Sequence, residues 1–322
     1  MPFSHHSHSG QYVSHAEDTL DEIVDQAKRM NFRTYCLTEH CPRYSNDLLY
    51  PEESDLSLGD LSATFDRYMV HAKRIQKKVN SDDKSRLKIL VGFESEGGID
   101  DLHLQKYRQL RDEYDVQLIV GSVHYIDRVP IDFDREQWLE AKSHYNSFQD
   151  YFKAYFDCQY EVVEKLKPEV VSHFDLIRLF EDGDVDRCEI TGKLLKDIDL
   201  KEDWPEVWLA IQRNIALINQ QGGLIEFNSA AIRKGWDSPY PKRDITEYAL
   251  SQSAKFCLSD DAHAISQVGL NYGKVLGYIQ SLGEKIQNIY FWDLKDGKLF
   301  VNHETIAELS QDPFWKMNQI DD

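Results

Sequence analysis

The sequence predicts an α/β fold in which seven or eight strand–helix units form a parallel sheet that closes into a barrel. Strand-like and helix-like segments alternate through most of the chain, and no Gly/Pro/Ser-rich linker divides it. Apolar strand-like runs repeatedly end on histidine, glutamate or aspartate, as expected where parallel strands share one mouth of a barrel. The length of 322 residues suits one such barrel. We therefore expect a single domain over residues 1–322.

Periodicity and capping signals place the elements in order. The first helix begins after Thr19, which forms a capping-box pattern with Glu22, and a strand then leads to His40. Further helices are expected near residues 65–79, 103–114, 147–166, 204–221 and 266–282. Further strands are expected at residues 89–93, 119–123, 170–172, 224–228, 256–258 and 289–292.

Two long irregular stretches interrupt this alternation, near residues 41–60 and 181–203. The first follows the strand that leads to His40, so in a barrel it would lie over the mouth. Long loops in such places are often lids or specificity elements. For the second stretch, which is acidic, a solvated insertion is an equally good interpretation.

Composition narrows the classes of function. A formal net charge of −19 argues against a general nucleic-acid or membrane-surface binder, because phosphate groups are bound by lysine and arginine. Small-molecule chemistry stays open, since bound divalent cations could attract an anionic substrate. Five cysteines without a CxxC pair indicate reduced, mostly structural thiols. With neither a signal-peptide pattern nor a stretch approaching 18 apolar residues, we expect a cytoplasmic protein.

The residues at the strand ends, with three histidines near the amino terminus, form a candidate metal site. The candidate ligands are His6, His8, His15, His40, Glu94, His124, His173, Asp261 and His263. A zinc ion usually takes four ligands, so nine ligands, one of them bridging, fit two or three metals. Mixed imidazole and carboxylate ligation suits Zn, Fe or Mn, and the order of affinities does not choose among them.

Each histidine signal is weak when taken alone. His6 and His8 would face the same side of an extended strand and could share a metal, but a solvated histidine-rich terminus explains them as well. His124 and His173 could each be a core histidine bonded to backbone. The repetition at successive strand ends favours the metal site over these alternatives.

The carboxylates leave more choices open. Glu94 is preferred to Glu96 because it lies nearer the strand end, and a carboxylate can bridge two metals. Asp261 would lie on the same side of an extended segment as His263, whereas Asp260 could cap a turn instead. Glu39 precedes His40 and is expected to point the opposite way, so it is not counted as a ligand.

These motifs together resemble the PHP family, named for polymerase and histidinol phosphatase, and within it the histidinol-phosphatase branch of the fungal type. The resemblance spans residues 6–263 and is specific as an ordered set. The motifs are His6-Ser7-His8 with His15, Thr38-Glu39-His40, Gly92-Phe93-Glu94, Ser122-Val123-His124, Ser172-His173-Phe174-Asp175, Glu226-Phe227-Asn228 and Asp261-Ala262-His263. Two departures are Ser4, where many members carry aspartate, and a gap from His8 to His15 one residue longer than in bacterial relatives.

The resemblance implies a distorted (β/α)7 TIM-like barrel with a trinuclear metal site. It implies that one metal is bound by His6, His8, Glu94 and Asp261, a second by Glu94, His124 and His173, and a third by His15, His40 and His263. The nucleophile would be a hydroxide that bridges the first two metals. On this basis Glu94, Asp261 and His263 are the expected catalytic residues.

The resemblance also implies a reaction, the hydrolysis of L-histidinol phosphate to L-histidinol and phosphate in histidine biosynthesis. Arg178 and Arg233 follow strand ends and could bind the phosphate, although surface-loop arginines are the alternative. Asp175, Tyr125 and the 41–60 stretch are candidates for binding the imidazole and ammonium. The alternative functions are a PHP phosphodiesterase or nuclease, another small phosphomonoesterase, and a metal-binding protein without activity.

Overall fold

A seven-stranded parallel sheet forms the centre of the computed structural model, which describes residues 2–295 and 297–317. Its strands are paired in the order β1-β2-β3-β4-β7-β8-β9, and every pair is parallel. The bounds are β1 Phe3–Ser4, β2 Thr34–Leu37, β3 Lys88–Glu94, β4 Leu118–Gly121, β7 Val170–Val171, β8 Leu224–Asn228 and β9 Phe256–Ser259.

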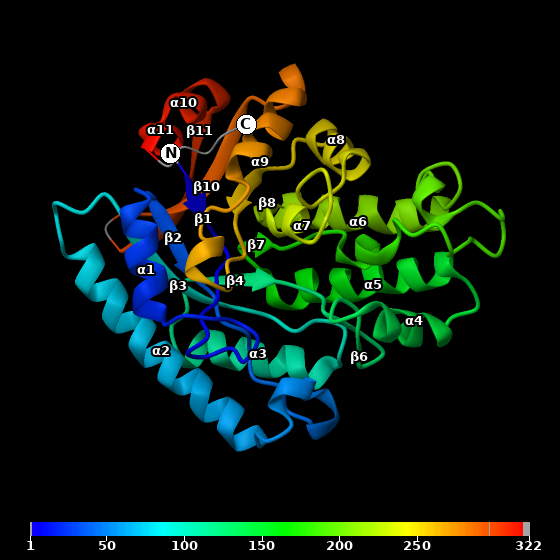
Figure 1. The fold of residues 1–322 in the computed structure, drawn as a ribbon, viewed down its shortest axis with the longest axis horizontal. Helices are drawn as coiled ribbons and strands as arrows, with labels where there is room; N and C mark the ends of the chain where they lie inside the picture. Colours follow the sequence, from blue (N-terminus) through cyan, green and yellow to red (C-terminus); the bar gives the residue numbers. More distant parts are fainter. Residues whose placement is uncertain (1, 296, 318–322) are drawn as a thin grey trace.

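The two ends of the sheet meet, so the sheet closes into a barrel. His5 donates its backbone N–H to the Leu258 carbonyl at 3.2 Å, and His8 donates to the Ala262 carbonyl at 2.8 Å. Helices surround this ring of strands on the outside (Figure 1). The predicted α/β class and the distorted seven-stranded barrel are confirmed.

The outer helices largely follow the predicted order. In α1 (Leu20–Arg29) the Thr19–Glu22 capping box is formed. The helix α2 (Leu58–Asn80) begins earlier than predicted, because Ser57 and Asp60 form a second capping box. The other predicted helices are α3 Asp101–Glu113, α5 Phe148–Leu166, α6 Pro205–Gln221 and α9 Tyr272–Ser281. The helices that sequence reasoning missed are α4 Arg135–Ser143, α7 Ala230–Arg233, α8 Arg243–Ser251, α10 Ile306–Gln311 and α11 Pro313–Met317.

The predicted strand at residues 289–292 does not join the sheet. It lies in β10 (Asn288–Lys295), which pairs antiparallel with β11 (Lys298–Thr305). This hairpin packs against the apolar side chains inside the barrel near the starts of its strands, among them Leu118, Val170 and Leu224. Its partly buried contributors are Tyr290, Trp292, Leu294, Leu299 and Val301. The hairpin therefore closes the amino-terminal end of the barrel, and the opposite end stays available for a site.

Phe291 of β10 packs against Phe3 of β1, and truncation of its side chain is expected to destabilise the fold. Its side chain is fully buried and stacks on Phe3 with ring centroids 3.8 Å apart. Phe291→Ala is expected to lower the free energy of unfolding by about 3–5 kcal/mol, because truncation leaves a cavity. Urea denaturation measures this, with Lys298→Ala at an exposed position as the control, expected within about 0.5 kcal/mol of wild type. Equal stability of the two variants would contradict the packing assigned to Phe291.

The two irregular stretches differ in where they lie. Residues 41–57 contain two 3₁₀ turns, Asn46–Leu48 and Pro51–Glu53, and reach the mouth of the barrel. Residues 181–203 instead form ion pairs with α4, through Arg135 with Asp186 and Lys142 with Glu189. One hydrophobic cluster includes residues from Leu20 to Phe314. The described part of the chain has no helix long and apolar enough to cross a membrane.

Candidate metal centre

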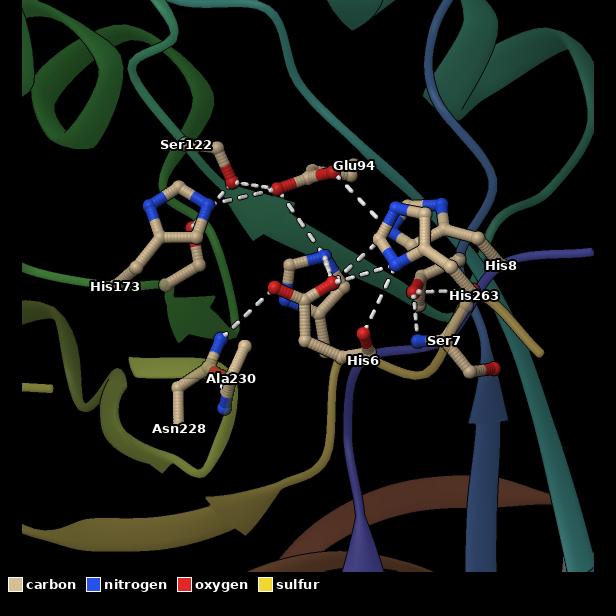
Figure 2. A network of polar contacts seen from close by, with 12 residues as sticks. His6, Ser7, His8, Glu94, Ser122, His173, Asn228, Ala230 and His263 are labelled. Carbon is tan, nitrogen blue, oxygen red and sulfur yellow. Dashed lines mark hydrogen bonds and ion pairs between the residues drawn. The ribbon is translucent and has the colours of Figure 1, made fainter. Parts of the chain in front are cut away.

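The predicted ligands gather at the carboxyl ends of the strands, around the carboxylate of Glu94. Glu94 is the last residue of β3, and the other ligands lie in segments that follow β1, β2, β4, β7 and β9. Figure 2 shows Glu94 between His173 on one side and His6 and His8 on the other. The shortest distances from its carboxylate oxygens are 3.1 Å to His6 Nε2, 3.4 Å to His8 Nε2, 3.1 Å to His40 Nδ1, 3.3 Å to His124 Nε2 and 3.1 Å to His173 Nε2.

Four groups of side chains place their ligand atoms within 4.8 Å of one another. The groups are His6–His8–Asp261, Glu94–His124–His173, His8–His40–His263 and His40–Glu96–His124. They share members, so the site is one continuous cluster rather than separate sites. Clusters of imidazole and carboxylate at this spacing are suited to divalent metal ions.

The nitrogens that face the cluster centre fit a metal better than a hydrogen-bond network. Nε2 of His6, of His8 and of His40 is buried and has no hydrogen-bond partner. A buried nitrogen without a partner costs free energy, so such atoms normally find one. A coordinated cation would satisfy all three, and the donor set therefore fits divalent metal ions.

The pKa shifts of two carboxylates and two histidines favour the forms that bind metal. Burial alone would raise the pKa of Glu94 and of Asp261, but neighbouring imidazoles, His6 above all, hold both values well below the usual range. Burial and the nearby His40 and His8 lower the pKa of His15 to about 3. Burial, with His8 beside it, holds the pKa of His263 well below its ordinary value. Ionised carboxylates and neutral imidazoles are the forms that bind metal. At His6, His8 and His124 burial would lower the pKa, but neighbouring carboxylates raise it in this metal-free arrangement.

Glu39, which was not counted as a ligand, belongs to none of the four groups but contacts the ring of His8. It is buried, its Oε2 lies 3.6 Å from His8 Nδ1, and its Oε1 accepts a hydrogen bond from Ser9 Oγ at 2.6 Å. β2 ends at Leu37, and the chain continues beside β3, with a parallel bridge between His40 and Glu94. Glu39 is therefore placed to orient the ring of His8.

Two further carboxylates contact the imidazoles. Glu96, the alternative to Glu94 in the sequence, belongs to one of the four groups, and no role was predicted for Glu226. Glu96 Oε2 lies 2.7 Å from His124 Nδ1, and its Oε1 lies 3.0 Å from His40 Nδ1. Glu226 lies 3.4 Å from His6 Nδ1 and accepts the backbone N–H of His173 at 2.8 Å. The signal for Glu226 was available, because a carboxylate amid the apolar residues of a buried strand needs a partner.

Asp260 supports the loop that carries Asp261. Its carboxylate accepts hydrogen bonds from Ser4 Oγ at 2.7 Å and from the backbone N–H of Gly269 at 2.8 Å. Ser4 thus fixes the segment after β9 to the first strand, at the position where many relatives carry aspartate. The departure from the family pattern at this position affects the support of the ligands and leaves the ligand set unchanged.

His15 is beside the cluster but outside all four groups. Its ring centroid lies 5.3 Å from that of His40 and 5.1 Å from that of His263. Its Nδ1 lies 3.4 Å from Glu52 Oε1, and 36% of its side chain is exposed. The structure thus brings His15 next to the other predicted ligands on the solvent side.

A cavity of about 320 Å³ opens onto the cluster. Its lining residues are His15, His40, Tyr50, Glu52, Glu94, His124, Asp132, Phe133, His173, Arg233, Lys234, Asp261, His263 and Gln267. The guanidinium of Arg233 is held there by the Asp261 carbonyl, to which its Nη2 donates at 3.0 Å. Asp175 and Tyr125, both candidates for binding the substrate, are buried and do not line this cavity.

Arg178 also does not line the cavity, which corrects its expected role in binding phosphate. Its Nε donates to Glu181 at 2.9 Å, and its Nη1 donates to Asp244 at 2.9 Å. The residue lies in a short 3₁₀ helix, Leu176–Phe180, and its side chain is buried. These two carboxylates occupy the Arg178 guanidinium, which lies outside the cavity described above.

Glu39 gives a test of the carboxylates that support the ligands. Glu39→Gln is expected to weaken divalent-metal binding about 10–100-fold, because His8 loses the negative partner that orients its ring. Competition with a chromophoric chelator measures the affinity. Glu206→Gln, an exposed carboxylate on α6, is the matched control and should bind metal as the wild type does. Unchanged affinity in Glu39→Gln would contradict the role assigned to Glu39.

Fold and site together define an α/β-barrel metalloprotein with a histidine–carboxylate cluster at the mouth of the barrel. Residues 4–230 match the family model described as the PHP domain. The chain belongs to the PHP family, as the sequence motifs predicted.

Similar proteins agree with this assignment. The chain is 37% identical to the histidinol-phosphatase of Saccharomyces cerevisiae, over 97% of this chain and 98% of that protein. It is 38% identical to a Schizosaccharomyces pombe protein named "Probable histidinol-phosphatase", over 88% of this chain and 87% of that protein. The solved histidinol phosphate phosphatase of Lactococcus lactis, complexed with zinc, L-histidinol and phosphate, has the same fold. The TM-score is 0.61 at 16% identity, covering 93% of this chain and 98% of that one.

Proposed function

We propose that the protein is a histidinol-phosphatase, a phosphoric monoester hydrolase that converts L-histidinol phosphate to L-histidinol and phosphate. The identity to the Saccharomyces cerevisiae enzyme over nearly the full length of both chains carries the proposal. The cavity supports it, because metal-binding side chains and a guanidinium face the same 320 Å³ space. A role in histidine biosynthesis and a cytoplasmic location belong to the same proposal.

The cluster would hold two or three divalent ions, with Zn, Fe and Mn as the candidates. We assign Glu94 as the carboxylate shared between the ion at His6, His8 and Asp261 and the ion at His124 and His173. His15, His40 and His263 would hold a third. Bound there, divalent ions would lower the pKa of a water and stabilise the negative charge that develops on the phosphate oxygens.

Arg233 is placed to orient the phosphate. Two backbone carbonyls, those of Asp260 and Asp261, accept hydrogen bonds from its guanidinium and fix its plane beside the cluster. A guanidinium held in this way can present its remaining N–H groups to two phosphate oxygens at once. Lys234, next in the chain and also lining the cavity, adds positive charge.

Steady-state phosphate release from L-histidinol phosphate and from a panel of other phosphate esters tests the proposal. We expect kcat/KM for L-histidinol phosphate to exceed that for every other monoester by about tenfold or more. Equal rates across the monoesters would favour a general phosphomonoesterase. Faster cleavage of a phosphodiester would favour the nuclease alternative, against which the net charge of −19 already argues. If the metal-loaded protein hydrolysed none of these esters, the alternative of a metal-binding protein without activity would be favoured.

A further inference from the structure

Two loops form the outer wall of the cavity, and each supplies one aromatic residue and one carboxylate. Tyr50 and Glu52 come from the segment that follows His40. Asp132 and Phe133 follow the small hairpin of β5 (Tyr125–Ile126) and β6 (Val129–Pro130), which itself follows His124. All four line the cavity that contains the metal ligands.

A line of ring contacts leads from the cluster to this outer wall. Ring centroids are 5.3 Å apart for His40 and His15, 6.1 Å for His15 and Tyr50, and 6.1 Å for Tyr50 and Phe133. The rings of Tyr50 and Phe133 are nearly parallel, at 17°. Phe133 is 44% exposed, which is unusual for a phenylalanine that lines a cavity. Its exposed ring offers a stacking surface at the mouth.

A chain of contacts joins the inner part of this wall to the ligand cluster. The buried guanidinium of Arg43 lies 4.6 Å above the Tyr50 ring centroid and donates to Glu96 at 3.2 Å. It also pairs with Glu53, whose other oxygen accepts the Tyr50 backbone N–H at 3.0 Å. Because Glu96 contacts His124 and His40, Tyr50 is fixed relative to the cluster.

Both carboxylates of the wall retain acceptor capacity. Glu52 Oε1 lies 3.4 Å from His15 Nδ1, and Asp132 Oδ2 lies 3.7 Å from Lys234 Nζ. Both distances exceed the usual range of about 2.7–3.2 Å for an N–H···O bond. Either carboxylate can therefore accept a hydrogen bond of ordinary length from a cationic ligand group that enters the cavity.

We propose that Tyr50, Glu52, Asp132 and Phe133 form the site that selects the substrate by its cationic, ring-bearing alcohol. The flat imidazole stacks on the aromatic rings, and the ammonium is bound by the carboxylates. A phosphomonoester that lacks ring and ammonium gains nothing from this wall, and one with a second anionic group is repelled. The inference rests on the proposed function and names the residues that give it its specificity.

Inhibition by the two products, measured separately during hydrolysis of L-histidinol phosphate by the metal-loaded enzyme, tests the proposal. The variants are Phe133→Leu and the double variant Glu52→Gln/Asp132→Asn. The inhibition constant of L-histidinol should rise roughly tenfold in each, since each loses a stacking surface or charged acceptors. The inhibition constant of inorganic phosphate should stay within about twofold, because phosphate binds at the metals and Arg233. Asp184→Asn, an exposed carboxylate of the 181–203 stretch, should change neither constant.

The outcomes separate this inference from the proposed function. If the wild type does not release phosphate from L-histidinol phosphate, the proposed function fails, and the inference fails with it. If the wild type is active and the L-histidinol constant stays unchanged in both variants, the inference alone fails. A parallel rise of both inhibition constants would also overturn it, because the residues would then act by supporting the metal centre.

Discussion

Replacing Glu94 by glutamine is expected to lower kcat/KM for L-histidinol phosphate by about a thousandfold or more, while the barrel stays folded. Glutamine keeps the shape of the side chain but removes the charge that the surrounding imidazoles share. Two of the metal ions proposed for this cluster would then lose the ligand that they share. Several kcal/mol of transition-state stabilisation would be lost as a result. Steady-state kinetics and metal content per chain, with circular dichroism for the fold, measure the effect.

Glu206→Gln on the outside of α6 is the matched control for the loss of one carboxylate and should retain wild-type kinetics. Glu94→Gln with activity within about tenfold of wild type would contradict the assignment of Glu94 as the shared ligand. If Glu94→Gln loses both its activity and its fold, Asp261→Asn provides the test instead. That variant should stay folded and lose turnover to the same extent, because Asp261 is another ligand of the cluster.

Replacing Arg233 by alanine is expected to lower kcat/KM by about a hundredfold, mostly through a higher KM. The guanidinium is held by the Asp260 and Asp261 carbonyls at the edge of the cavity, so its loss removes a fixed, charged donor to the phosphate. Arg233→Lys keeps the charge without the fork and should recover only part of the loss. Steady-state kinetics with inorganic phosphate as an inhibitor measure both variants.

Arg187→Ala, at an exposed arginine of the 181–203 stretch, is the control for removal of a positive charge. Arg233→Ala should also weaken inhibition by inorganic phosphate, whereas inhibition by L-histidinol alone should be nearly unchanged. An unchanged phosphate inhibition constant in Arg233→Ala would remove Arg233 from the substrate site.

The barrel and the ligand cluster could be predicted from the sequence for one physical reason. Parallel strands in a closed sheet bring their carboxyl ends to one mouth, so ligand-type residues after successive apolar runs must converge. Glu94, His124 and His173 illustrate this, since each follows or ends such a run and all three meet in one group. The strand-end pattern did not depend on knowing the loops.

What lies beyond the strand ends could not be predicted in this way. Arg178 lies in a 3₁₀ helix, where side-chain direction is set by local backbone geometry rather than by the alternation of a strand. Tyr50 and Phe133 come from different loops, and their parallel rings meet only in the folded chain. The sequence of β10 resembles that of a strand of the central sheet. A strand that packs against the amino-terminal end of the barrel needs the same apolar residue types as a strand within the sheet.

Titration of the metal-free protein with a divalent transition metal, while L-histidinol phosphate hydrolysis and bound metal per chain are recorded together, tests the central claim most directly. The account predicts no hydrolysis in the metal-free protein and full activity only when two or three ions are bound per chain. Full activity with fewer than two bound ions, or without added metal, would contradict it.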